Sequence, residues 1–181
     1  MPSIPEVRGV FEMESAYFNR DQVKLVRSAS EWAESIVTDY YRIAPREWKE
    51  MPYEVRTLRH LKSSEIVDTA LAHTLCYEVK RAVGNFYFGE TELYRICLQD
   101  HRILNASGQN STLLEAILLY VMTHELVHVV RFGRNMQEID LPHDLRINEE
   151  MNVDKTTRTI MEKTGHTSRL VLAIERVSPH E

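Results

Sequence analysis

Apolar side chains recur at helical spacing over the first well-patterned stretch of the chain, residues 21–44. They fall three or four positions apart, which places them on one face of an α-helix. Pro45 disfavours helical backbone at the residue before it, so the helix should end there. The spacing therefore predicts one long helix after an arm, residues 1–19, that has no clear period. Its expected inner face is Val23, Val26, Ala33, Ile36, Val37 and Tyr40.

The next stretch has a mixed pattern. Residues 45–52 contain two prolines and predict a connection, and a short strand is expected within Tyr53–Leu61. Ser63 or Ser64 can cap a second helix that runs to Val83, because Gly84 follows as a helix-ending residue. The apolar residues expected on its inner side are Ile66, Val67, Ala70, Leu71 and Leu75.

A strand pattern follows Gly84. Tyr94, Ile96 and Leu98 alternate with polar or small residues, which is the period of a strand with one buried face. Residues 100–102 are expected to turn the chain into a further strand at 103–105. The pattern predicts a small antiparallel or mixed sheet ahead of the next helix.

The longest apolar run extends from Thr112 to Gly133. Thr112 and Glu115 have the spacing of a capping box, and Gly133 stands where a left-handed residue often ends a helix. A helix that is apolar on all sides belongs in a core, and Glu115, His124, Glu125 and His128 interrupt the run too often for a membrane span. This stretch predicts a central buried helix.

Two further helices are predicted after a loop that contains Pro142. One runs from an N-cap at Asp144 to Lys163, and a shorter one covers Arg169–Val177. The chain shows no repeat and no linker. We therefore expect a single domain over residues 1–181 with an α+β fold, mostly helical, whose small sheet precedes the central helix.

The central helix carries the main chemical signal, His124, Glu125 and His128 in the pattern H-E-x-x-H. Residues four apart lie on the same face of a helix, so both imidazoles can reach one metal ion. Glu125 lies about 100° further round, where it can act on a water without being a ligand. The alternative is a pair of ordinary core histidines, but buried titratable groups are costly without a partner. The pattern favours a zinc site.

Two histidines leave a catalytic zinc one protein ligand short. Glu150 and Asp154 follow on the next predicted helix, four residues apart. With these residues the stretch Leu93–Met161 resembles the gluzincins, the thermolysin-like branch of the zincin metallopeptidases. In the metzincin branch a glycine and a third histidine would stand where this chain has Arg131 and Arg134.

The resemblance implies a function and a set of roles. Glu150 would be the third zinc ligand, Asp154 would orient His124, and Glu125 would act as general base and then acid in peptide-bond hydrolysis. It also implies a zincin-like core over residues 85–165 behind an N-terminal helical extension, residues 1–62. An exposed edge strand in the region Leu93–Asn105 would align an extended peptide or protein substrate.

Several alternatives stay open. Glu149 and Glu138 are other possible third ligands, but Glu150 is preferred because a carboxylate follows it one turn later, whereas a valine follows Glu149. His143, Arg158 and His166 are near enough in sequence to stabilise an oxyanion, and none is assigned that role. The domain could be catalytically silent, binding zinc as a regulatory or interaction module. A deformylase-like hydrolase would use Cys97 as a ligand, but its glycine-rich motifs are missing.

The composition limits the kinds of binding partner that we expect. Apolar residues make up 43% of the 181 residues and charged residues 27%, as in a globular domain that folds without needing a metal. The net charge of −5 and the lack of a basic cluster argue against nucleic acid. The N-terminus has no apolar segment of the signal-peptide kind, so we expect a cytoplasmic protein with no membrane partner, in which Cys76 and Cys97 are free thiols.

Overall fold

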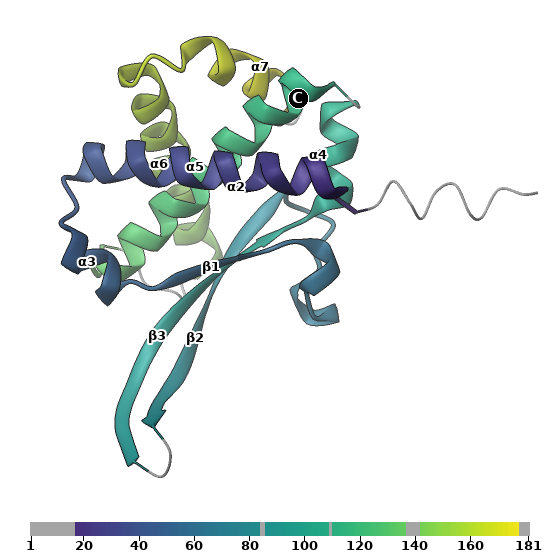
Figure 1. Cartoon of the computed structure of the whole chain (residues 1–181). Coiled ribbons are helices and arrows are strands. Elements are labelled where there is room, and N and C mark those ends of the chain that lie inside the picture. Colours follow the sequence, from purple (N-terminus) through teal and green to yellow (C-terminus); the bar gives the residue numbers. More distant parts are fainter. Residues whose placement is uncertain (1–16, 84–85, 109, 137–141, 178–181) are drawn as a thin grey trace, which may run out of the picture.

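A computed structural model describes residues 17–83, 86–108, 110–136 and 142–177. The chain forms an α+β fold in which helices predominate around a small mixed sheet (Figure 1). The helices are α2 (Arg20–Tyr41), α3 (Pro45–Glu50), α4 (Asp100–Ser107), α5 (Ser111–Gly133), α6 (His143–Lys163) and α7 (Thr167–Val177). The strands are β1 (Tyr53–Arg56), β2 (Ala72–Val83) and β3 (Phe86–Leu98), and the short 3-10 helices are η1 (Leu58–His60) and η2 (Ser63–Glu65).

The sheet has the order β1-β3-β2. β1 runs parallel to β3, and β2 runs antiparallel to it, with Thr74 opposite Ile96 and Cys76 opposite Tyr94. The β2–β3 hairpin is much longer than β1 and extends beyond the helices as an arm (Figure 1). Because β3 pairs on both sides, it is the central strand. The expectation of an edge strand in Leu93–Asn105 is therefore wrong.

Helix α5 is the core helix of the molecule. Of its 23 residues, 15 are buried, and α2, α4, α6, α7 and β2 all contact it. By length and composition alone α5 would suit a membrane span, but 89% of its most apolar window is buried inside the fold. The prediction of a central buried helix is confirmed.

The ends of α5 differ from the prediction. Asn110, not Thr112, caps the helix, because its side chain accepts a hydrogen bond from the Leu113 backbone N–H. Gly133 is the last helical residue and is not left-handed. A Cβ at Gly133 would lie only 2.3 Å from Cγ and Sδ of Met51, so glycine is required there by close packing.

The other helices and strands test the remaining expectations. α2, α6, α7 and β3 are confirmed, although Val23 and Tyr40 on α2 are exposed. The N-cap of α6 is Pro142, so the prediction of Asp144 as its N-cap is wrong. The helix predicted for residues 63–83 is wrong, because this stretch forms η2 and β2. The strand predicted at 103–105 is also wrong and lies within α4, and the predicted connection at 45–52 contains α3.

Candidate metal centre

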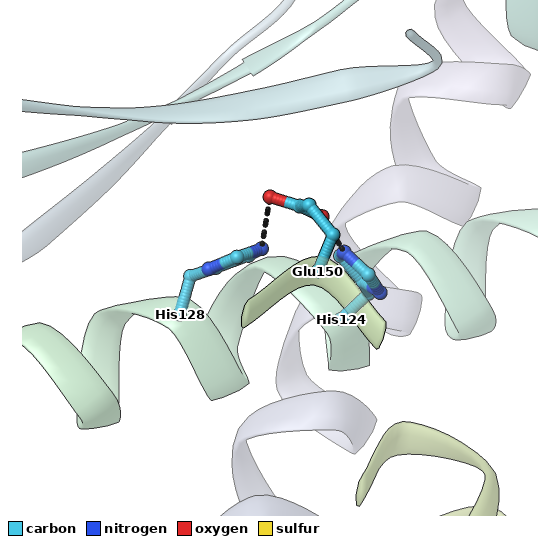
Figure 2. A group of neighbouring side chains, drawn as sticks. All are labelled: His124, His128 and Glu150. Carbon is cyan, nitrogen blue, oxygen red and sulfur yellow. Dashed lines mark hydrogen bonds and ion pairs between the residues drawn. The ribbon is translucent and has the colours of Figure 1, made fainter. Parts of the chain in front are cut away.

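Three side chains from two helices converge beside the middle of α5. His124 and His128 lie one turn apart on the same face of α5, and Glu150 reaches them from α6 (Figure 2). Nε2 of His124 lies 3.3 Å from Oε2 of Glu150, and Nε2 of His128 lies 3.3 Å from Oε1. These donor atoms all lie within 4.8 Å of one another, and they form a candidate metal site.

The donor set suits zinc. The two nitrogen–oxygen separations of 3.3 Å involve different oxygens of Glu150, so its carboxylate faces both imidazoles at once. Two imidazole nitrogens and one carboxylate are also the donor set of many catalytic zinc sites, which keep one position open. The side chains of His124 and His128 are 19% and 8% exposed, whereas Glu150 is 52% exposed, so the site opens on its α6 side.

Aromatic rings support both imidazoles. Tyr120, His124, His128 and Phe132 follow one another at intervals of four along α5. The Tyr120 ring lies 6.2 Å from that of His124, and the Phe132 ring stacks on His128 at 5.9 Å. Tyr94 of β3 stacks in turn on Phe132. Packing on both sides limits how far the imidazoles can rotate.

Glu125 points toward the sheet. Its side chain is buried, and its Oε2 accepts a 2.8 Å hydrogen bond from the Thr74 hydroxyl of β2. Glu125 thus follows His124 directly on α5, but it is not one of the three residues that converge, His124, His128 and Glu150.

Asp154 has partners other than the one predicted. It accepts hydrogen bonds from the Tyr120 hydroxyl on one oxygen and from Nε of Arg158, at 2.7 Å, on the other. Nδ1 of His124 is buried and has no hydrogen-bond partner in the described part of the chain. The predicted contact between Asp154 and His124 is therefore not formed in this structure.

The structure also distinguishes among the three glutamates considered as the third metal ligand. Glu149 forms an ion pair with Arg131 of α5 and is absent from the group that surrounds the histidine nitrogens. Glu138 lies outside the described residues. Of the three candidates, Glu150 is the one that the structure brings to His124 and His128.

The electrostatics of Glu150 follow from its neighbours. Burial alone raises its pKa, but the hydrogen bonds and positive charge of His124 and His128 outweigh this effect and hold the pKa well below its ordinary value. Glu150 is therefore ionised at neutral pH, which is the state that a carboxylate needs to bind a metal.

The other candidates have different neighbours. Cys97 is buried on β3, and Arg158 pairs with Asp154. His143 is exposed at the start of α6, and the ring of His166 lies near Trp32. Within the described residues, none of these four belongs to the converging group.

Sequence reasoning missed three residues that shape the site, Thr74, Tyr120 and Arg131. Thr74 is far from the motif in sequence and sits in a segment predicted to be helical, so no local pattern pointed to it. Tyr120 stands one turn before His124, and Arg131 stands three residues after His128. Their helical spacing from the histidines was available as a signal.

Comparison of this chain with protein-family models, with curated proteins and with solved structures found no match.

Proposed function

We propose that this protein is a zinc-dependent metallopeptidase with a zincin-like core. The observation that carries the proposal is the convergence of His124, His128 and Glu150 with their candidate ligand atoms within 4.8 Å of one another, and with Glu125 next to His124 on the same helix. The gluzincin resemblance of H-E-x-x-H and Glu150 supports the same assignment.

Each residue has a role that its position supports. His124, His128 and Glu150 would hold the zinc through two Nε2 atoms and a carboxylate. When bound, zinc lowers the pKa of a coordinated water towards 7 and polarises a carbonyl oxygen. Glu125 accepts a proton from the attacking water and then donates it to the leaving amine. The Thr74 hydroxyl donates to Oε2 of Glu125 and would hold the carboxylate in one orientation for proton transfer.

The substrate would lie along β2. Within the described residues, β2 pairs with β3 on one edge and with no strand on the other, and Thr74 links it to Glu125. An extended peptide can add to such an edge through backbone hydrogen bonds, which select conformation more than sequence. We therefore assign to β2 the substrate-aligning role that the sequence suggested for Leu93–Asn105.

The test combines metal analysis with digestion. We expect one zinc per chain and chelator-sensitive cleavage of casein or a peptide library. Glu125→Gln keeps the size of the side chain but cannot accept a proton, so it should bind zinc normally and lose at least about a hundredfold in activity.

The outcomes separate the competing functions. Zinc binding without cleavage of any peptide would favour a silent metal-binding module. Equal turnover by the Glu125→Gln variant would remove Glu125 from the mechanism. A His124→Ala, His128→Ala double variant that retained full zinc content would disprove the site itself.

A further inference from the structure

Two polar contacts join α5 to α6 on either side of the metal triad. The Tyr120 hydroxyl donates to Asp154, and the Arg131 guanidinium pairs with Glu149. Tyr120 is four residues before His124, and Arg131 is three residues after His128. On α6 the partners flank Glu150 in the opposite order, with Glu149 directly before it and Asp154 four residues after it. The two contacts therefore bracket the triad between antiparallel helix segments.

Apolar packing holds this part of α6 only on the C-terminal side of Glu150. The buried residues of the helix are Val153, Thr157, Ile160 and Met161, and all of them follow Glu150. The described residues before Glu149 on α6 are exposed, including Leu145 and Ile147. On the N-terminal side the position of the Glu150 backbone thus depends on contacts other than a hydrophobic core.

The Tyr120–Asp154 and Arg131–Glu149 contacts are shielded from solvent, so they can restrain the backbone at Glu150. The side chains of Arg131 and Glu149 are only 15% and 12% exposed, and Tyr120 is buried. A charged hydrogen bond in such surroundings is stronger and more directional than one on the surface. Tyr41 at the end of α2 also interacts electrostatically with Arg131, although less strongly than Glu149 does.

We infer that Tyr120 and Arg131 are positioning residues of the metal centre, which hold Glu150 at the two histidines through Asp154 and Glu149. The inference rests on the proposed metal site and adds residues to it. Neither residue is a ligand or contacts the reacting atoms. Each acts by fixing the α6 backbone on one side of Glu150, so that the carboxylate is already in place when zinc arrives.

The experiment measures zinc affinity by competition with a chelator of known affinity. The variants are Tyr120→Phe, Arg131→Glu, Glu149→Arg and the double variant Arg131→Glu, Glu149→Arg. Each is made in the wild-type chain and in a Glu150→Ala background. Tyr53→Phe and Arg134→Glu are matched controls, because these residues pair with Glu34 and Glu47, away from α6.

The expected result is a specific pattern of coupling. In the wild-type chain each single variant should weaken zinc binding about tenfold. The charge-swapped double variant should recover most of the affinity. In the Glu150→Ala background the same changes should alter the affinity by less than about twofold, because the ligand that they position is gone. The control variants should bind zinc like the wild type.

The following outcomes would overturn the inference. Unchanged affinity in Tyr120→Phe and Arg131→Glu would show that the contacts do not position Glu150. Equal losses with and without Glu150 would show a general effect on the fold. Tyr120→Phe removes only one hydroxyl, so it decides the question even if the charge variants fail to fold. A wild-type chain that binds no zinc would overturn the proposed function together with the inference, whereas zinc binding that depends on Glu150 alone would overturn only the inference.

Discussion

Thr74 shows how a single hydroxyl can shape the proposed base. Glu125 is buried, and a carboxylate in that setting needs a hydrogen-bond donor to compensate its lost hydration. The Thr74 hydroxyl supplies one at 2.8 Å and also fixes the rotation of the carboxylate. A base held in one orientation presents the same oxygen to the attacking water in every turnover.

Replacing Thr74 should therefore affect turnover more than binding. Thr74→Val keeps the shape of the side chain but removes the donor, and a hydrogen bond to a charged group contributes about 1.5–3 kcal/mol. We expect kcat to fall about tenfold while KM and zinc content stay unchanged. The control is Thr74→Ser, which retains the hydroxyl and should keep most of the activity. Equal kcat in the valine variant and the wild type would contradict this role.

The sequence predicts those features of the candidate site that depend on residue spacing within a single helix. His124 and His128 are recognisable because helical geometry puts residues four apart on one face. Glu150 is preferred to Glu149 as the third ligand because a carboxylate follows Glu150 one turn later. That carboxylate, Asp154, nevertheless bonds Tyr120 and Arg158. Which partner it takes depends on how α5 and α6 are set against each other, and sequence spacing does not specify this.

At the scale of elements, β2 shows why a strand was mistaken for a helix. The apolar residues from Ile66 to Leu75 fit a helical period, and the prediction extended this helix to Val83. What makes residues 72–83 a strand is a register of backbone pairs with β3, the next strand in the chain. Leu75, Tyr77 and Val79 are two positions apart in this stretch, which is a strand signal that the prediction did not use. By contrast α2, α5 and α6 each carry a long helical pattern, and all three were predicted.

The close contact between the end of α5 and Met51 yields a prediction about stability. A Cβ at Gly133 would lie 2.3 Å from two atoms of Met51, which is only 2% exposed and cannot move aside freely. Gly133→Ala should therefore lower the free energy of unfolding by about 1–3 kcal/mol, as overpacking does. Urea unfolding measures this directly. In a Met51→Ala background the same substitution should cost much less, and an equal cost in both backgrounds would exclude the steric cause.

A buried carboxylate fixes the segment around η2 to the sheet and predicts a response to acid. Glu65 is 1% exposed and accepts hydrogen bonds from Tyr77, Arg95 and the Lys62 backbone N–H. Burial raises its pKa, but these donors outweigh burial and lower the pKa from 4.5 to about 2. A carboxyl group with a depressed folded-state pKa stabilises the fold fully above its unfolded-state pKa, and this stabilisation is lost as pH falls through the folded-state value.

The wild-type free energy of unfolding should therefore decrease from about pH 4.5 toward pH 2. Glu65→Gln should be less stable than the wild type at pH 7, and the difference should shrink across this range. Thermal unfolding at a series of pH values gives both curves. Glu78→Gln, which changes an exposed carboxylate on β2, is the control and should follow the wild type. A constant difference between Glu65→Gln and wild type at all pH values would contradict the assignment.

For the whole molecule, the location of the candidate site separates metal binding from folding. The buried residues form one apolar cluster that extends from α2 through α5 to α7 and the sheet. Only Glu150 among the three candidate ligands comes from outside α5, and it is half-exposed. The cluster is thus complete without any contribution from a metal ion, unlike the cores of small zinc-dependent domains.

The metal-free protein should accordingly remain folded but melt at a lower temperature. Zinc at a hundred times its dissociation constant stabilises the folded state by about 2.7 kcal/mol. For a chain of about 150–250 residues each kcal/mol corresponds to about 2–4 °C, so the melting temperature should rise by about 5–11 °C on adding zinc. Circular dichroism of the chelated protein should keep the helical signal and a cooperative transition. The His124→Ala, His128→Ala variant should show no zinc-dependent shift. Loss of helix and of cooperative melting on chelation would show instead that the metal is required for the fold, because the cluster around α5 would then be unable to hold the helices together alone.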